Sequence, residues 1–146
     1  MSHRELAVSP AGSVAIMYKI ETKNIRVRAA PRFMPSQSTP DENYYFWTYT
    51  IDITNAGNAT VRLMTRHWRI TDMGGRTEEV RGDGVIGEQP VLRPGDTFSY
   101  TSGCPLRTPS GIMVGSYRMQ SEGGDEFDVA IPAFSLDSPF TQRRLN

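Results

Sequence analysis

Apolar residues recur at every second position along much of the chain, in short runs that turn-forming residues separate. The run YYFWTYTIDITN (residues 44–55) shows this most clearly: its large apolar side chains share one parity and its threonines share the other. Such alternation predicts a strand with one buried face and one solvent-exposed face. Comparable runs follow one another from residue 14 to residue 136, with Gly, Pro, Asn and Asp between them.

These runs predict seven or eight strands, and no stretch reads as an amphipathic helix of ten residues. The chain is therefore predicted to be an all-β protein, an antiparallel two-sheet sandwich of the immunoglobulin/fibronectin type III-like kind. The cysteine pair of antibody-type domains is absent, so the fibronectin type is the nearer analogue. The residues expected to contribute to the core are Trp47, Ile51, Trp68, Phe98, Tyr117, Val129 and Ile131.

Local signals also predict how some strands are joined. Turns are expected at Lys23-Asn24 and at Gly123-Gly124, and the residues 55–58 (Asn-Ala-Gly-Asn) have the composition of a hairpin turn. The apolar parity changes between Leu63 and Trp68, so a β-bulge between these residues would restore the register.

The length of 146 residues fits one domain with one core. We expect a mobile N-terminal tail over residues 1–13, a single domain over residues 14–140 and a C-terminal tail over residues 141–146. No apolar run is long enough for a secretory signal or a membrane span, and the chain has one cysteine. The expected location is the cytoplasm, with no membrane association.

Sixteen basic and sixteen acidic residues give a formal net charge of zero. A balanced charge argues against nonspecific binding to nucleic acid, which requires excess positive charge. Fourteen of the basic residues are arginines, a bias that reflects either genomic composition or selection for contacts with anions.

The stretch GDGVIG places Gly82, Gly84 and Gly87 in the spacing of the dinucleotide-binding fingerprint. That motif requires a helix after the glycines, and Pro90 prevents one, so we expect no nucleotide cofactor. Two interpretations remain. The glycines either serve turns and a bulge, or they form a nest of backbone amides that binds a pyrophosphate-like anion together with Arg81.

The sequence offers little catalytic chemistry. Cys104 is interpreted as a buried structural cysteine, because His67 is the one histidine outside the tail that could serve as its base. The carboxylates near Glu78 match no metal-ligand spacing, and one histidine is poor evidence for a transition-metal site. We therefore predict no catalytic residues, no metal site and no cofactor. Tyr44, at the start of its strand, is the candidate contact with a protein partner, because tyrosine is enriched at binding hot spots.

Several blocks of the sequence resemble the ApaG family, also called CorD. They are HW-ITD in RHWRITD, GEQPVL-PG in the stretch that follows GDGVI, and TSGCPL-TP-G, and the resemblance extends over about residues 17–140. It implies a fibronectin type III-like sandwich in a small bacterial cytoplasmic protein. Members are often encoded beside a diadenosine tetraphosphate hydrolase and are associated with cobalt resistance and magnesium efflux. The family's Gly-rich motif, proposed to bind pyrophosphate, falls on Gly82, Gly84 and Gly87.

Three functions are compatible with these observations. The leading one is a non-enzymatic module that binds an unidentified protein partner, as related eukaryotic domains fused to F-box and polymerase-interacting proteins suggest. The second is weak binding of pyrophosphate or a nucleotide polyphosphate through the Gly-rich loop. The third, a hydrolase that uses Cys104 or a metal, has the least support from the residues.

Overall fold

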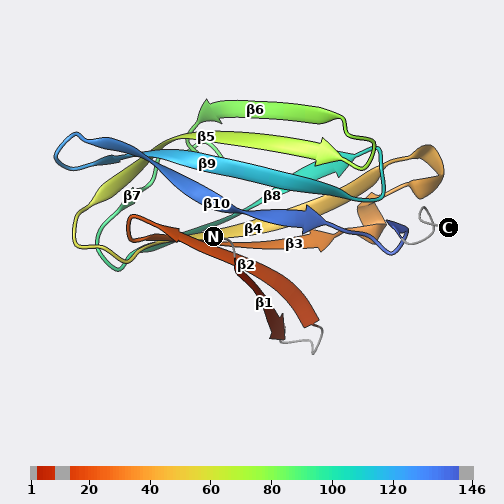
Figure 1. Ribbon diagram of the computed structural model, residues 1–146, viewed down its shortest axis with the longest axis horizontal. Coiled ribbons are helices and arrows are strands. Elements are labelled where there is room, and N and C mark those ends of the chain that lie inside the picture. The colour runs from red at the N-terminus through yellow and green to blue at the C-terminus, as the bar shows by residue number, and fades with distance from the viewer. Residues whose placement is uncertain (1–2, 9–13, 142–146) are drawn as a thin grey trace.

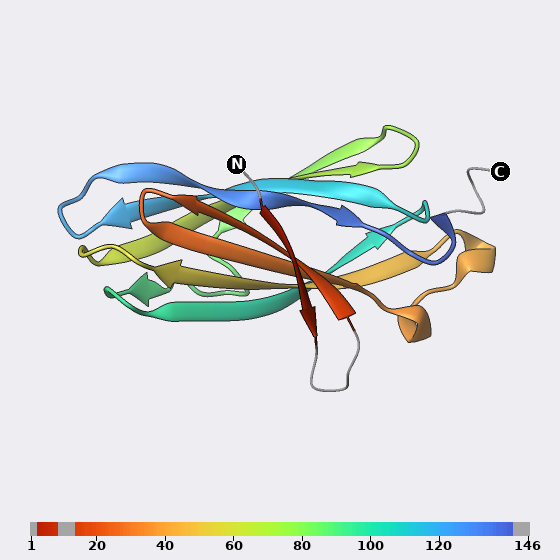
Figure 2. The same cartoon turned by 60° about the horizontal axis from the view of Figure 1, so that its bottom comes forward.

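The computed structural model describes residues 3–8 and 14–141, with side chains from residue 16 onward. Two antiparallel sheets pack face to face (Figures 1 and 2). The strands are β1 (His3–Val8), β2 (Val14–Thr22), β3 (Ile25–Phe33), β4 (Tyr45–Asn55), β5 (Val61–Asp72), β6 (Thr77–Asp83), β7 (Val91–Leu92), β8 (Thr97–Leu106), β9 (Gly111–Ser121) and β10 (Glu126–Leu136). No helix of the described residues is long and apolar enough to cross a membrane.

The first sheet has the order β1-β2-β3-β4-β8, and the second has the order β10-β9-β5-β6, with β7 paired to β5. The predicted all-β antiparallel sandwich is therefore confirmed. The alternation in β4 explains why it forms: every odd-numbered residue of this strand is buried, and every even-numbered one is partly exposed.

The described residues form ten strands where the sequence predicts seven or eight, and the two additional ones are β1 and β7. β1 lies within the expected tail and pairs with β2 from His3↔Lys19 to Val8↔Val14. Strand pairing uses backbone groups, so it requires no alternation in the sequence. The rest of the expected tail, residues 1–2 and 9–13, lies outside the described residues. β7 has only two residues, too few to show a period.

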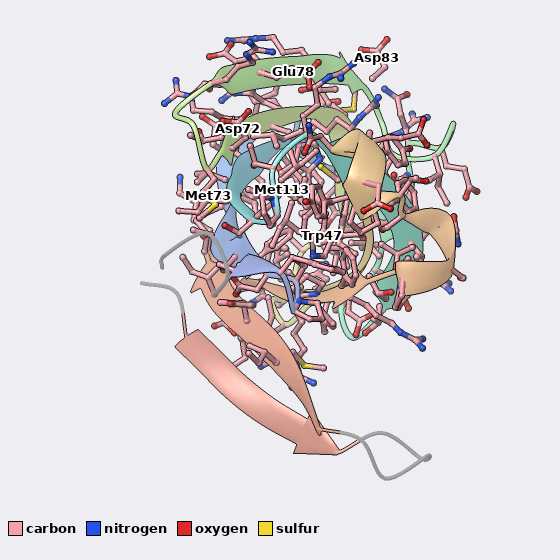
Figure 3. All side chains as sticks on the ribbon, turned by 90° about the vertical axis from the view of Figure 1, so that its right-hand side faces the viewer. Trp47, Asp72, Met73, Glu78, Asp83 and Met113 are labelled. Carbon is pink, nitrogen blue, oxygen red and sulfur yellow. The ribbon has the colours of Figure 1, made fainter. Side chains whose placement is uncertain are left out.

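The core lies between the two sheets, and Figure 3 shows Trp47 and Met113 at its centre. All the expected core residues are buried except Phe98, which is partly buried and packs against the core. The rings of Tyr49 and Trp68 meet edge to face at 5.4 Å between centroids, and this contact joins the two sheets.

The hairpin turn at Lys23-Asn24 is confirmed, since both residues have positive φ (48° and 66°) between β2 and β3. The bulge in β5 is also confirmed, because the register against β9 shifts between Leu63 and Thr65. The expected hairpin at residues 55–58 is wrong. The strands on either side, β4 and β5, belong to different sheets and do not pair, so this turn carries the chain across the sandwich.

Candidate functional site

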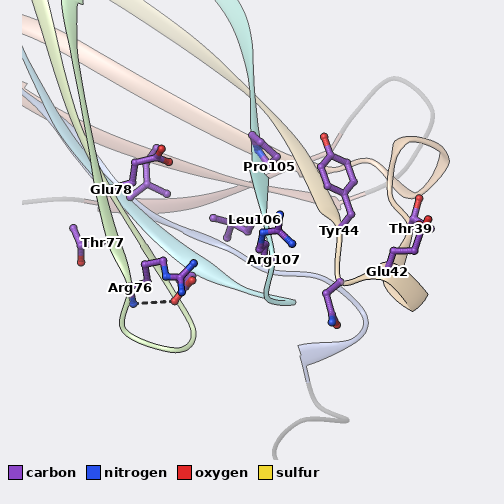
Figure 4. Close-up of a pocket in the computed structure, with 12 residues that line it drawn as sticks. Thr39, Glu42, Tyr44, Arg76, Thr77, Glu78, Pro105, Leu106 and Arg107 are labelled. Carbon is purple, nitrogen blue, oxygen red and sulfur yellow. Dashed lines mark hydrogen bonds between the residues drawn. The ribbon is translucent and has the colours of Figure 1, made fainter.

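The candidate site is a groove of about 890 Å³ at the open side of the sandwich (Figure 4). There β8 is the last strand of one sheet and β6 the last strand of the other. The groove is bounded by three segments: residues 39–44, the hairpin joining β5 to β6, and the end of β8. Its apolar lining comes from Tyr44, Ile70, Pro105 and Leu106.

The first segment contains two short 3-10 turns, η1 (Pro35–Gln37) and η2 (Pro40–Glu42). Thr39 and Tyr44 close it, because the backbone N–H of each donates to the carbonyl of the other at 2.8 and 3.1 Å. The next residue, Tyr45, is buried in the core, so the alternation of the strand directs Tyr44 outward. Tyr44 is 42% exposed and lines the groove, and its role as a contact with a protein partner stays a prediction.

The second segment is fixed by Asp72. Its carboxylate oxygen Oδ1 accepts hydrogen bonds from the backbone N–H groups of Gly74 (2.9 Å) and Arg76 (3.0 Å). The backbone N–H of Met73 donates to Thr108 Oγ1 at 3.0 Å, which ties the hairpin to the segment after β8. The groove wall is therefore held by hydrogen bonds within the protein.

Charged side chains of both signs line the same groove: Glu42, Glu78, Arg76 and Arg107. Within the described part of the chain, no ion pair involves any of these four. The groove thus combines an apolar lining with charges that are open to an external ligand.

The glycines of the Gly-rich loop have structural roles. Residues 85–88 form a tight turn in which the backbone N–H groups of Val85 and Glu88 donate to each other's carbonyls at 2.8 and 2.9 Å. Ile86 and Gly87 have φ of 42° and 79°, the positive values that a type I′ turn requires. The amide of Gly84 donates to the carbonyl of Met64 at 2.9 Å. Three amides near this turn are therefore already used inside the protein.

Arg81 and Gly82 lie in β6 rather than in this turn. The Arg81 side chain is 71% exposed and lies 3.5 Å from the carboxylate of Glu79. The arginine that contacts the loop is Arg66, which the sequence did not single out: its Nη1 donates to the carbonyls of Asp83 (3.1 Å) and Gly84 (3.0 Å). A Cβ on Gly82 would lie 2.8 Å from that nitrogen, so the glycine makes room for the guanidinium.

Cys104 is a buried residue of β8, and burial, with a smaller contribution from Glu78, raises the pKa of its thiol to about 12. His67 lies on the outer face of the second sheet, since its neighbour Trp68 points into the core. Its Nε2 is 3.5 Å from a carboxylate oxygen of Glu79. The structure therefore does not bring Cys104 and His67 together. Residues 3–8 and 14–141 also contain no group of three His, Cys, Asp or Glu residues arranged to hold a metal ion.

Fold and groove together define a class: a fibronectin-like sandwich with a mixed apolar and charged groove between two strand edges. The model of the ApaG domain matches residues 35–121. The chain is 57% identical over 130 residues to Protein ApaG of Beijerinckia indica subsp. indica, which covers 89% of this chain and all of the relative. It is 58% identical to Protein ApaG of Rhizobium meliloti over the same length. This chain belongs to the ApaG family.

Solved structures agree with this assignment. The crystal structure of the putative ApaA protein from Bordetella pertussis superposes with a TM-score of 0.78 at 47% identity, and covers 83% of this chain and 97% of that one. The C-terminal domain of wzt matches with a TM-score of 0.50 at 12% identity, a likeness of fold alone. All three groove segments fall within the residues that the family model matches.

Proposed function

We propose that this protein is a non-enzymatic binding module whose groove receives part of a protein partner. The observation that carries the proposal is the position of Tyr44, a large exposed ring at the wall of a groove. Ile70 and Leu106 add apolar surface beside it, and Arg76 and Arg107 add charges without a partner in the described chain. A central aromatic anchor with polar groups around it is typical of a protein-binding hot spot.

The chemistry of the other candidate residues supports a non-enzymatic role. The thiol of Cys104 is buried and its pKa is raised, whereas a catalytic cysteine is activated by a lowered pKa and a nearby base. The location in the cytoplasm and the link to cobalt resistance and magnesium efflux, which the family resemblance implies, belong to this same proposal.

Photo-crosslinking in the native cytoplasm tests the proposal. A benzophenone amino acid introduced in place of Tyr44 is expected to give a discrete adduct with one partner, because the ring lies at the groove wall. The same amino acid in place of Val91, an apolar side chain that is at least as exposed (56%) and lies away from the groove, is the matched control. Adducts of the same pattern from both positions, or none from Tyr44, would contradict a binding role for the groove.

A second variant separates binding from stability. Arg107→Glu reverses an exposed charge of the groove that makes no ion pair within the described residues, so the fold is expected to keep its stability within about 0.5 kcal/mol. The yield of the Tyr44 adduct is expected to fall. An unchanged yield in both Arg107→Glu and Arg76→Glu would show that the partner does not use the groove charges.

Weak binding of pyrophosphate by the Gly-rich loop is the second candidate function. It is favoured by the exposed guanidinium of Arg81, beside the segment that contains Gly82, Gly84 and Gly87. The nearby carboxylates of Asp83 and Glu88 oppose an anion, so we expect affinity no better than about millimolar. An NMR titration with pyrophosphate tests it, and resonances of residues 81–88 that stay unchanged at tens of millimolar (about ten times that Kd) would eliminate the site. Arg81→Ala should abolish any shift that is seen.

A further inference from the structure

The outer edge of β6 is unpaired, and the hydrogen bonds of its hairpin show which residues face outward. The N–H of Asp72 donates to the carbonyl of Arg76, and that of Gly84 donates to the carbonyl of Met64, both at 2.9 Å. Hydrogen-bonded and non-hydrogen-bonded residue pairs alternate along an antiparallel pair of strands. Counting from these two bonds, the backbone groups of residues 78, 80 and 82 bond to β5. The backbone N–H and C=O groups of Thr77, Glu79 and Arg81 therefore point away from the sheet. β6 pairs with no described strand except β5.

The edges at β10 and β8 differ from this one. β10 contains Pro132, which has no backbone N–H to donate. A side chain of the other sheet also covers its edge, because Thr22 Oγ1 accepts a hydrogen bond from the N–H of Ala130 at 3.3 Å. β8 presents Thr97, Ser99, Thr101, Gly103 and Pro105 along its edge, which carry no charge that could select a register. β6 presents an exposed acid and an exposed base two residues apart. Figures 1 and 3 show no other element on its outer side.

We propose that a second copy of this chain adds to β6 as an antiparallel strand, with Val80 opposite Val80 of the second copy. This joins the second sheets of the two copies in the order β10-β9-β5-β6-β6-β5-β9-β10. On the outer face, Glu79 then lies opposite Arg81 of the second copy, and the two-fold axis repeats this pair in the other direction. In the isolated chain Arg81 lies opposite His67 and 3.5 Å from the carboxylate of Glu79 in its own strand, so the second copy adds an acid on the other side of Arg81.

The inner face is complementary in the same register. Val80 is half-buried and meets its equivalent, which completes an apolar contact at the axis. Glu78 lies opposite Gly82 of the second copy. The guanidinium of Arg66 lies over that glycine, so the carboxylate of Glu78, which has no ion pair within the described residues, faces a positive charge. Both faces of the joined sheet are therefore complementary in this register.

The neighbouring symmetric registers do not match. Moving the axis by one residue to Glu79 places Glu79 opposite itself, and moving it to Arg81 places two arginines opposite each other. An axis at Glu78 sets two carboxylates together on the inner face. Like charges directly opposite each other destabilise a pair of strands, so the charges exclude these three registers. An axis at Gly82 also sets Arg81 opposite Asp83, but it pairs only residues 81–83 of β6, whereas the axis at Val80 pairs residues 77–83.

Sedimentation equilibrium on the whole chain tests this inference. The weight-average mass is expected to rise from 16.3 kDa toward twice that value over a roughly hundredfold range of protein concentration. Glu79→Arg and Arg81→Glu should each stay monomeric, because each places like charges together at both contacts. An equimolar mixture of the two variants should associate again, since every contact then joins an acid to a base. Circular dichroism of each variant confirms that it is folded.

Arg93→Glu is the matched control, because Arg93 is also exposed (79%) and paired with an acid but lies away from β6. It should associate like the original chain. Hydrogen exchange locates the interface: the amides of Thr77, Glu79 and Arg81 should become protected as concentration rises. A mass that stays at 16.3 kDa throughout, a mixture that does not associate, or association that leaves these amides unprotected would each overturn the proposal.

Discussion

Gly84 occupies a backbone position that other residues fit poorly. Its φ is +62°, and a Cβ placed on it would lie 2.1 Å from the carbonyl oxygen of Glu88. The nearby Gly87 also has positive φ (+79°) but has no atom within 4 Å of an added Cβ. A substitution at Gly87 therefore tests the cost of positive φ alone, and a substitution at Gly84 tests positive φ together with a steric clash.

Substitution by alanine should therefore lower the free energy of unfolding more at Gly84 than at Gly87. Gly87→Ala is expected to lower the free energy of unfolding by about 1 kcal/mol, the cost of positive φ. Gly84→Ala should cost clearly more, because the turn must also open. Gly123→Ala, where φ is not positive and the space is open, is the control and should change little. Urea denaturation measures all three, and equal losses at Gly84 and Gly87 would show that the clash relaxes at no cost.

Cys104 should be unreactive in the folded protein. With its pKa raised to about 12 by burial, the thiol is only about one part in ten thousand thiolate at pH 8. A disulfide reagent added at that pH is therefore expected to label it slowly, and much faster once urea unfolds the chain. Labelling of the folded protein at the rate of a free thiol would contradict its burial and would revive a catalytic role.

Among the elements, the crossing from β4 to β5 depends on a buried asparagine. The side chain of Asn55 donates through Nδ2 to the carbonyls of Ala59 (2.8 Å) and Leu92 (3.0 Å). Its Oδ1 accepts from the N–H of Gly57 at 3.0 Å. One side chain thus satisfies backbone groups of the turn and of β7.

Asn55→Ala is expected to destabilise the fold by at least about 2 kcal/mol, because it leaves buried backbone groups without partners. Asn58→Ala is the matched control: Asn58 is exposed in the same turn, and its substitution should stay within about 0.5 kcal/mol. Thermal or urea unfolding measures the difference. Equal effects at the two positions would show that the turn, rather than the buried amide, determines the loss.

The crossing from β4 to β5 also shows which part of the fold could not be predicted from the sequence. The parity change in β5 and the turn at Lys23-Asn24 were predictable, because both are local and leave a local pattern. The residues 55–58 have hairpin composition, yet they join two sheets, since the choice of pairing partner is made by distant strands. Tyr44 was predictable as an exposed ring. Ile70 and Leu106 follow core parity, and they become groove residues because they lie at the open side of the sandwich, where β6 and β8 are the last strands of the two sheets.

At the scale of the whole molecule, two tyrosine hydroxyls connect the sheets. Tyr100 of β8 and Tyr117 of β9 are hydrogen-bonded at 2.5 Å between their oxygens, within the core. Burial raises the pKa of both phenols, and to a smaller extent that of Tyr49. Their stabilising contribution is complete below the unfolded value of 10.0 and is lost as pH rises above it, because only the unfolded chain then releases the protons.

Stability should therefore fall above pH 10 by up to about 1.4 kcal/mol per pH unit for each of Tyr100 and Tyr117. Urea unfolding across alkaline pH measures the slope, and the part of the tyrosinate absorbance that comes from the buried tyrosines should appear together with unfolding. Tyr117→Phe removes one of the titrating groups, so its slope should be shallower. A tyrosinate band of full amplitude in protein that is still folded would contradict the burial of these hydroxyls.

β10 closes one side of the sandwich, so the core is completed only when the last strand is in place. β10 packs across β2 and β3, and its Ala130 amide bonds to Thr22. Strands from the two ends of the sequence therefore complete one core. During synthesis, the β2–β3 hairpin emerges long before β10 and keeps the face that β10 covers in water until β10 has left the ribosome. Folding must wait for nearly the entire chain and then close long loops, so it is slow, and an incomplete chain exposes surface that promotes aggregation.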